Sequence, residues 1–330
     1  MFARKRLAFG VLGVLSALAL AACDAGVTEP VSAGPERPLL ARKPKKTEPA
    51  PEPTPDPDPT PPPTGTTPAF ADGFESGARA AAQNGYGWTF AQAGGGGDAV
   101  SVSNTIARTG SYSLRFTYGG NPDLCDDAFS EQRFALGEDL KEVWFEYYLY
   151  FPSGGTTAGP KFYHRAVCAT ANDPRALDTN NKFFALWDVD YRARNVAFVM
   201  EYRRTTTGSD GDSYLYNLWG GASVVQHSST EGVGQWNGFM TDANRGRWVQ
   251  VRIHARISDS ADPAKANGLV EVWFDGVKRI NESGIPLMST NSAGNFFRNG
   301  YLMGWSNSGF DQTTSVYLDD FKIFRSSPGW

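Results

Sequence analysis

Apolar and polar residues alternate along VQVRIHARIS, residues 249–258. The odd positions are apolar, and the even positions from 250 to 256 are Gln250, Arg252, His254 and Arg256. A period of two over this length is typical of a β-strand that turns one row of side chains into a core. The other row carries hydrogen-bond donors and positive charge, so its role depends on the surface that the other strands build beside it.

Nine further stretches show strand-like patterns. They are SYSLRFTY (111–118), SEQRFAL (130–136), EVWFEYYLYF (142–151), KFFALWD (182–188), NVAFVMEYR (195–203), DSYLYNLW (212–219), GLVEVWFDG (268–276), GYLMGWS (300–306) and SVYLDDFKIF (315–324). Clusters of Gly, Asn, Asp and Ser separate them, as turns require. GARAAAQN (77–84) is expected to form at most a short turn of helix. The pattern predicts an all-β domain, a jelly-roll β-sandwich of two antiparallel sheets.

Several of these strands carry bulky residues on both faces. Tyr148 alternates with Tyr147 and Leu149, and Trp187 follows Leu186. Apolar side chains on both sides of a strand suit a sheet whose second face is not open to water. We therefore expect a concave groove on one sheet.

The strands all lie in residues 69–330, which we expect to form one domain. This segment holds all nine Trp, all 13 Tyr and 19 of the 21 Phe, enough large apolar side chains for a core. Residues 23–68 are low in complexity, and 14 of the 21 prolines lie at or before Pro68. Such a chain buries too little apolar surface to fold, and its prolines keep it extended. We expect a disordered linker there.

The first 22 residues have the pattern of a secretory signal. A basic start at residues 4–6 precedes an apolar stretch that is too short to span a bilayer comfortably. The Leu-Ala-Ala-Cys sequence that ends at Cys23 resembles a bacterial lipobox, which implies cleavage before Cys23 and lipidation of its thiol. This predicts a protein of the bacterial cell envelope, at the outer membrane or cell surface, that contacts the membrane only through its lipid anchor.

The net charge and the cysteines of this domain indicate which binding partners and which cross-links to expect. Residues 69–330 carry 23 Lys and Arg against 28 Asp and Glu, a net charge of −5, without a basic block. Nucleic-acid binding is therefore not expected. Two cysteines remain in this domain, Cys125 and Cys168, and an even pair in an exported protein predicts one disulfide. We expect a monomer.

Six motifs occur along the chain in a characteristic order. They are DGFESG (72–77), GSYSLRF (110–116), SEQRF (130–134), YLYFP (148–152), NGLVEVWFDG (267–276) and YLDDFKIF (317–324). This succession resembles the concanavalin A-like lectin/glucanase superfamily, and within it the jelly-roll polysaccharide lyases that act on uronic-acid polymers such as alginate and glucuronan. In such folds a concave sheet binds a glycan across its strands. The resemblance thus implies that the groove faces an acidic polysaccharide.

The resemblance leaves the specific activity open. SEQRF is similar to the Arg-Ser-Glu-Leu-Arg strand of alginate lyases but departs from it, and the Gln-Ile-His motif is missing. The Glu-x-Asp-x-x-Glu pattern of laminarinase-type glycosidases is missing as well. Three functions remain: an eliminative lyase on a uronic-acid glycan, a carbohydrate-binding protein without catalysis, and a glycoside hydrolase.

An eliminative lyase must neutralise the uronate carboxylate, remove the C5 proton and protonate the leaving oxygen. The candidates for these catalytic roles are Arg133, Tyr163, His164, Tyr191 and His254. The candidates for substrate contacts are Glu131, Lys182, Trp187, Trp219, Arg252 and Trp305. We expect the charged row of residues 250–256 to line the groove, close to the side chains of SEQRF. For Arg252 and His254 an alternative is an outward convex face, on which neighbouring carboxylates such as Glu271 pair with them.

The two other functions use some of the same residues. Sugar rings stack on flat aromatic faces, so Trp187, Trp219 and Trp305 also suit a binding platform, although large aromatics fill sandwich cores too. A hydrolase needs two carboxylates about 5–9 Å apart across a cleft. Glu146, Glu201 and other carboxylates on aromatic strands are available, but their spacing singles out no pair.

The resemblance also implies a structural metal site. In many jelly-roll carbohydrate modules, a Ca2+ ion links a Glu near the first strand to an Asp of the last strand, and Glu75 and Asp320 match those places. Carboxylate oxygens are suitable ligands for Ca2+. No cofactor is expected to be required for activity.

Overall fold

The computed structural model describes residues 66–120, 128–152, 179–189, 196–204, 214–220, 223–227, 244, 246–288, 295–306, 310 and 313–330. These residues belong to one compact unit, Pro61–Trp330. Within them, no helix is long and apolar enough to cross a membrane. The predicted signal, Cys23 and the linker lie outside the described residues, as do both cysteines of the predicted disulfide, Cys125 and Cys168. The corresponding expectations stay predictions.

The described strands form two antiparallel sheets. Sheet A has the order β13-β12-β11-β6-β15-β4-β3, and β1 pairs with β15. Its strands are β1 (Phe70–Asp72), β3 (Ala99–Ser103), β4 (Ser113–Tyr118), β6 (Glu142–Tyr150), β11 (Trp248–Arg256), β12 (Gly268–Phe274), β13 (Val277–Ile285) and β15 (Thr314–Phe324). The prediction of an all-β jelly-roll sandwich is confirmed.

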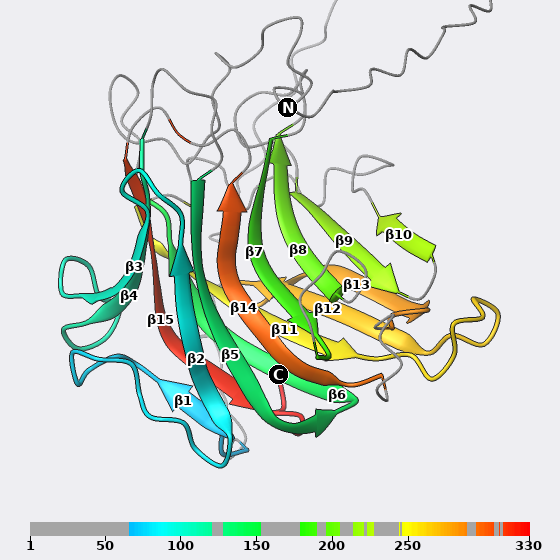
Figure 1. Ribbon diagram of the computed structural model, residues 1–330. Coiled ribbons are helices and arrows are strands. Elements are labelled where there is room, and N and C mark those ends of the chain that lie inside the picture. The colour runs from blue at the N-terminus through cyan, green and yellow to red at the C-terminus, as the bar shows by residue number, and fades with distance from the viewer. Residues whose placement is uncertain are drawn as a thin grey trace, which may run out of the picture. The chain divides into compact units, whose positions relative to one another are not determined.

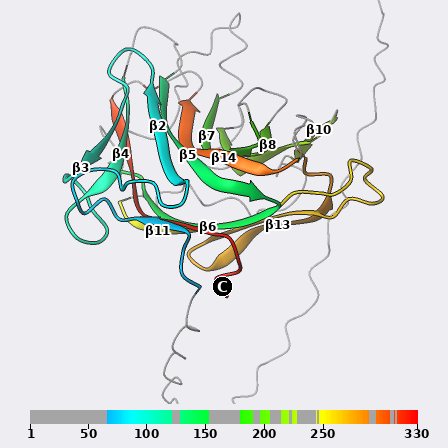
Figure 2. The same ribbon diagram turned by 60° about the horizontal axis from the view of Figure 1, so that its bottom comes forward.

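Sheet B has the order β10-β9-β8-β7-β14-β5-β2. Its strands are β2 (Tyr86–Ala93), β5 (Ala128–Leu140), β7 (Thr179–Trp187), β8 (Val196–Arg204), β9 (Tyr214–Gly220), β10 (Ser223–His227) and β14 (Phe297–Ser306). In Figure 1 its strands run in front of β6, β11 and β12 of sheet A, and Figure 2 shows them bending above sheet A. Sheet B thus has one face against sheet A and one face turned away, which we call the outward face of sheet B.

The core lies between the two sheets. On β11, Val249, Val251 and Ile253 are fully buried and alternate with polar residues, as the sequence predicts. Phe134 of sheet B packs against Phe145 and Phe321 of sheet A, with ring centroids 5.5 Å apart in both cases. Burying a side chain of this size stabilises the fold by about 1.5–3 kcal/mol. These aromatic contacts therefore join the two layers.

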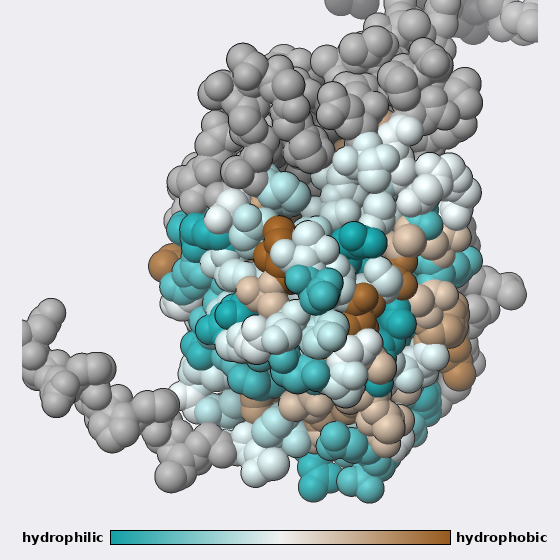
Figure 3. Space-filling model, turned by 90° about the vertical axis from the view of Figure 1, so that its left-hand side faces the viewer, coloured by the Kyte–Doolittle hydropathy of each residue, from teal (hydrophilic) through white to brown (hydrophobic). Residues whose placement is uncertain are grey.

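The outer surface is mainly polar where it can be seen beside β3 and β4. Figure 3 shows this side of the molecule, with hydrophilic residues predominating and hydrophobic residues scattered among them. Residues 77–84 contain no helix, which agrees with the expectation of at most a short helical turn there. Asp72 organises this region instead, because its carboxylate accepts hydrogen bonds from the backbone N–H of Phe74 and Ala80, at 2.7 Å each, and from Nε1 of Trp88.

Candidate functional site

Strand β5, which contains SEQRF, turns alternate side chains to the two faces of sheet B. Ala128, Phe134 and Leu136 belong to the core between the sheets. Ser130 also faces sheet A, because its hydroxyl donates to the backbone oxygen of Thr117 on β4. The intervening residues, which include Glu131 and Arg133, therefore lie on the outward face of sheet B.

Glu131 and Arg133 form an ion pair on this outward face. Nε of Arg133 donates to Oε1 of Glu131, and the two side chains are 21 % and 1 % exposed, respectively. Burial raises the pKa of Glu131, while the hydrogen bond and the charge of Arg133 oppose that shift, as does the nearby charge of Lys182. A carboxylate this deeply buried needs a cation beside it. Glu131 in turn fixes the plane of the partly exposed guanidinium.

Aromatic rings flank the guanidinium of Arg133. Its Cζ lies 4.7 Å from the ring centroid of Phe90 on β2 and 5.5 Å from that of Trp187 on β7. Both distances are within the range of cation–π attraction. Tyr301 of β14 is the register partner of Arg133, and its ring lies 5.7 Å from that of Trp187. Four neighbouring strands of sheet B thus contribute to the surroundings of one charged group.

The backbone behind Phe90 is held from the core side of the sheet. Gln132 is fully buried, and its Nε2 donates to the backbone oxygen of Phe90 at 3.2 Å. Its Oε1 accepts a hydrogen bond of 2.5 Å from Nε of Arg79. Because the register of β2 and β5 shifts between Trp88 and Ala91, these bonds replace regular strand pairing next to Phe90.

Part of the outward face of sheet B is itself buried. Ala185, Trp187, Val199 and Tyr301 form an apolar cluster that is separate from the core between the sheets, and none of them is more than 3 % exposed. Nearer the β2 edge, Phe90 is 49 % exposed and Trp305 of β14 is 40 % exposed. The open part of this face therefore lies over β2, β5 and β14.

The row on β11 is not part of this face. Strand β11 lies in sheet A, and because Val251 and Ile253 point into the core, Arg252 and His254 point away from sheet B. The prediction that this row lies beside Arg133 is wrong, and both residues are excluded from a centre built around Arg133. The alternation along β11 correctly predicted which side chains are buried and which are not. It did not predict to which of the two sheets the strand belongs.

Carboxylates of sheet A hold the charged row of β11, as in the alternative considered for it. Nε of Arg252 donates to Oε2 of Glu146 at 2.8 Å. The two ring nitrogens of His254 contact Glu271 and Glu142 at 2.8 and 2.7 Å, and its ring stacks on Trp144 with centroids 4.6 Å apart. These contacts account for the row as part of a paired polar surface.

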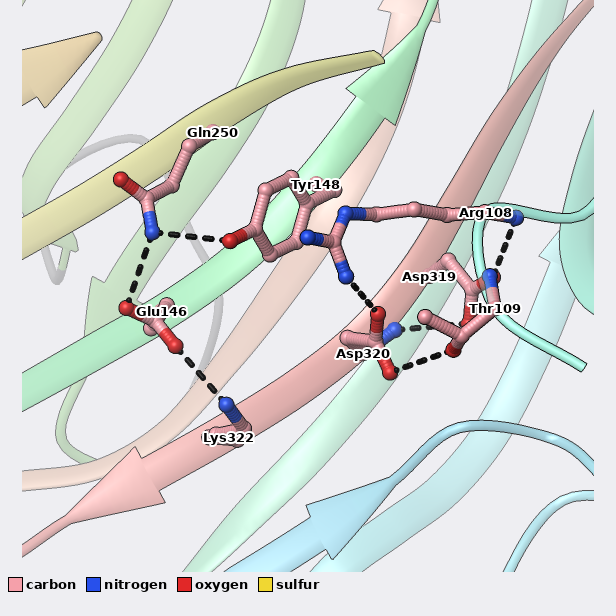
Figure 4. A network of polar contacts seen from close by, with 8 residues as sticks. All are labelled: Arg108, Thr109, Glu146, Tyr148, Gln250, Asp319, Asp320 and Lys322. Atoms are coloured by element: carbon pink, nitrogen blue, oxygen red, sulfur yellow. Dashed lines mark hydrogen bonds and ion pairs between the residues drawn. The ribbon is translucent and has the colours of Figure 1, made fainter. Parts of the chain in front are cut away.

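A polar network continues across the outward side of sheet A (Figure 4). Gln250 donates to Glu146 and to the hydroxyl of Tyr148, and Lys322 donates to the other oxygen of Glu146. Burial alone raises the pKa of Glu146, but its bonds to Lys322 and Arg252 outweigh that effect, so its pKa lies below the usual value. Glu146 therefore stays ionised at neutral pH as the centre of the network.

The two residues of the predicted Ca2+ site lie next to the same segment, 108–112. Glu75 accepts hydrogen bonds from the backbone N–H of Ser111 and Tyr112, at 2.8 and 3.3 Å. Asp320 is paired with Arg108 at 2.6 Å and accepts a bond from the hydroxyl of Thr109. A group of three or more acidic, His or Cys side chains suited to a metal is not found among the described residues. Because the guanidinium of Arg108 already pairs with Asp320, this arrangement does not favour Ca2+ binding there. The Ca2+ site stays a prediction.

The remaining candidates divide into two groups. Lys182 is a half-buried residue of β7 in sheet B, the sheet that carries Arg133. Trp219 belongs to β9 of the same sheet, but its side chain is outside the described part of the structure. Tyr163, His164 and Tyr191 also lie outside the described residues, so their proposed roles remain predictions.

Three aromatic residues of the outward face were not singled out from the sequence. Tyr301 lies four residues before Trp305 on one strand, but simple alternation does not describe the segment between them, because Leu302 and Met303 both belong to the core cluster and Met303 has a positive φ. Phe129 lies four residues before Arg133 on β5, a spacing that places both side chains on the same face of that strand. The sequence around Phe90 did not indicate a strand, because YGWTFAQA lacks regular alternation and contains a bulge.

Comparison with known proteins places the chain in a family. A model of the polysaccharide lyase family matches residues 81–322, and the chain belongs to that family. No curated protein matches the chain. The family assignment establishes a carbohydrate-active class of protein and leaves the glycan open.

Two solved structures show the same fold. The endo-β-1,4-glucuronan lyase from the fungus Trichoderma reesei superposes with a TM-score of 0.52 at 12% identity, over 79% of this chain and 96% of that chain. A variant of the alginate lyase Aly36B, in complex with an alginate trisaccharide, superposes with a TM-score of 0.50 at 11% identity, over 79% and 99%. At this identity the likeness shows the fold alone.

Proposed function

We propose that this protein is an eliminative lyase that cleaves a uronic-acid-containing polysaccharide on the outward face of sheet B. The observation that carries the proposal is the Glu131–Arg133 pair, in which a buried carboxylate orients a partly exposed guanidinium. The family assignment supports a lyase. The glucuronan and alginate lyases that share the fold act on uronic-acid polymers, which supports that substrate class.

The reaction needs no external oxidant or reductant. A base removes the proton from C5 of the uronate, the C5–H electron pair forms a C4=C5 double bond, and the bond from C4 to the bridging oxygen breaks. The departing oxygen takes a proton from an acid. The carboxylate at C5 is the group that makes this proton removable, because it accepts the developing negative charge as an enolate.

Arg133 is the residue that we assign to the uronate carboxylate. A guanidinium matches a carboxylate in charge and geometry and stays protonated at all relevant pH values. Because Glu131 and the rings of Phe90 and Trp187 hold it in place, little reorientation is needed when the negative charge develops. Tyr163, His164 and Tyr191 remain the predicted sources of the base and the acid.

The test compares full-length protein with two variants of Arg133 and one matched control. Arg133→Ala and Arg133→Lys are expected to lower kcat/KM about 100-fold or more, as the loss of one stabilising donor does in other enzymes. Arg256→Ala removes an exposed arginine from the outward side of sheet A and is expected to leave kcat/KM unchanged. Ultraviolet absorbance of the unsaturated uronate is measured on alginate, glucuronan, pectin and heparin-like polymers.

Two results would reject the assignment. Full activity in Arg133→Lys, with a melting temperature equal to that of the unmodified protein, would show that the guanidinium is not used. New reducing ends without ultraviolet absorbance would show hydrolysis instead of elimination. Arg133→Ala alone does not decide the matter, because removing the partner of buried Glu131 also threatens folding.

A second function is favoured by one observation. The exposed rings of Phe90 and Trp305 are surfaces on which sugar rings stack, with or without catalysis. A carbohydrate-binding protein would retain polymer in affinity electrophoresis and release neither unsaturated uronate nor new reducing ends. That combination would replace the lyase proposal.

A further inference from the structure

The outward side of sheet A carries a row of side chains that the proposed reaction does not use. The row crosses the sheet where β6 ends and β11 begins. Leu149 of β6 and Leu114 of β4 point into the core from neighbouring positions, so the row points away from sheet B. Its members are register partners on four adjacent strands, and we call them the aromatic row of sheet A: Trp248 (β11), Tyr150 (β6), Tyr317 (β15) and Arg115 (β4).

The three rings of the aromatic row contact one another in series. The ring centroids of Trp248 and Tyr150 lie 5.4 Å apart, and those of Tyr150 and Tyr317 lie 6.2 Å apart. Tyr317 is 6 % exposed, whereas Trp248, Tyr150 and Arg115 are half-buried. Three strand spacings separate the backbone of Trp248 from that of Arg115, which is about 14 Å. The row is thus wide enough to contact more than one sugar unit of a chain that lies across the strands.

Arg115 has no acceptor among the described residues. Its Nε is buried and forms no hydrogen bond. Its register partners on the two adjacent strands, Ser101 and Tyr317, are uncharged. Asp319, two residues further along β15, accepts hydrogen bonds from the backbone instead. Because a buried donor without an acceptor costs free energy, an anion that bonds to this guanidinium would be favourable.

Cations in the neighbouring rows of the same side are paired. Arg108 contacts Asp320 at 2.6 Å (Figure 4). Lys322 and Arg252 each contact Glu146 at 2.8 Å. Arg115 therefore differs from these cations in that the fold supplies it with no counter-charge, and it lies beside aromatic rings.

We propose that the aromatic row of sheet A is a second binding surface for the acidic glycan. In this surface Arg115 pairs with a uronate carboxylate, and the rings of Trp248 and Tyr150 contact sugar rings. The inference takes its ligand from the proposed function, in which the polymer supplies both carboxylates and flat sugar faces. Because the row points away from sheet B, this surface holds polymer without taking part in its cleavage.

The experiment measures how many oligomers one chain binds. Full-length protein with Arg133→Lys is used, so that the ligand is not cleaved, and it is titrated by calorimetry with glucuronate and mannuronate hexamers. Cellohexaose is the neutral counterpart of the β-1,4-linked glucuronate hexamer. Arg115→Met and Trp248→Ala are added separately. Arg256→Met is the matched control, because it removes a half-exposed guanidinium from the same side of sheet A at the other end of β11.

Arg115→Met is expected to weaken binding of one hexamer per chain about tenfold or more, the scale of a lost hydrogen bond to a charged group. Trp248→Ala is expected to weaken the same binding event, Arg256→Met to leave it unchanged, and cellohexaose not to show it. The melting temperature of Arg115→Met is expected to stay equal or to rise, because no partner is lost. Unchanged hexamer binding in Arg115→Met, or a loss that Arg256→Met shares, would overturn the inference.

Turnover separates this inference from the proposed function. In protein that retains Arg133, Arg115→Met is expected to leave kcat/KM on a tetrasaccharide unchanged and to reduce retention by polymer in affinity electrophoresis. If the unmodified protein releases no unsaturated uronate but Arg115 still governs hexamer binding, the lyase proposal fails and the second surface stands. If turnover is normal and Arg115→Met binds the hexamer as before, only the second surface is rejected.

Discussion

At the scale of single residues, the buried carboxyl of Asp319 affects how stability depends on pH. It lies on β15, is fully buried, and accepts hydrogen bonds from the backbone N–H of Arg108, at 2.8 Å, and of Asp320, at 2.7 Å. Burial raises its pKa to about 6, although these backbone bonds act in the opposite direction. The folded state therefore holds the proton of Asp319 more tightly than the unfolded chain does.

The difference between the folded-state and unfolded-state pKa of Asp319 determines whether stability rises or falls with pH. The folded-state pKa is raised above the unfolded value, so the stabilising contribution is complete below about pH 4 and is lost as the pH rises through about 6. Asp319→Asn cannot ionise and does not lose stability in this window. We predict that the melting temperature of the variant rises relative to that of the unmodified protein between about pH 4 and pH 7. A constant difference across this range would contradict the assignment.

Residue identity was a partial guide to the site. SEQRF directed attention to Glu131 and Arg133 through its similarity to a strand of alginate lyases, and the structure shows the two residues paired on the outward face of sheet B. Their roles in a reaction stay predictions. For Arg252 and His254, the expected place beside SEQRF was wrong, because their partners Glu146, Glu142 and Glu271 lie on strands of sheet A. A strand pattern separates two faces but does not tell which other strands share each face.

At the scale of elements, the sequence predicted interior strands and missed edge strands. All ten predicted strands occur in the structure, with ends that differ by a few residues. The four that terminate the described sheets, β13, β3, β10 and β2, were not predicted, nor was the three-residue β1. An edge strand such as VKRINESGI is short of apolar residues, because a polar edge discourages pairing with other chains.

Gly300 shows how closely the central elements of sheet B are packed. It lies on β14, between β5 and β7. A Cβ atom at this position would overlap the ring of Phe134 and would lie 2.7 Å from the backbone oxygen of Ala185. The absence of a side chain thus lets three strands and a core ring meet.

We predict that Gly300→Ala lowers the free energy of unfolding by about 1–3 kcal/mol, the usual cost of overpacking. Gly95→Ala is the matched control, because a Cβ atom at Gly95 would meet no atom within 4 Å and the substitution is expected to be neutral. Chemical denaturation of both variants measures the difference. Equal stability of the two variants would mean that β14 moves freely away from Phe134.

At the scale of the whole domain, the two sheets separate two kinds of polar surface. On sheet A, the described ionic side chains near β11 are joined into networks in which each carboxylate has more than one partner. On sheet B, the buried Glu131 is bonded to the partly exposed Arg133 beside exposed aromatic rings. This division was not accessible from strand patterns, because it depends on the order of strands in each sheet.

The separation of the two faces predicts that the charged row of β11 does not take part in turnover. In Arg252→Gln, Glu146 keeps its bonds to Lys322 at 2.8 Å and to Gln250 at 3.1 Å, so the loss of stability should be about 1 kcal/mol or less. Activity on the best polymer, measured as kcat/KM, should equal that of the unmodified protein in Arg252→Gln and in His254→Gln. Arg133→Lys should lose activity in the same assay. If Arg252→Gln lost activity with an unchanged melting temperature, the reaction would have to involve sheet A, and the assignment of the outward face of sheet B would be wrong.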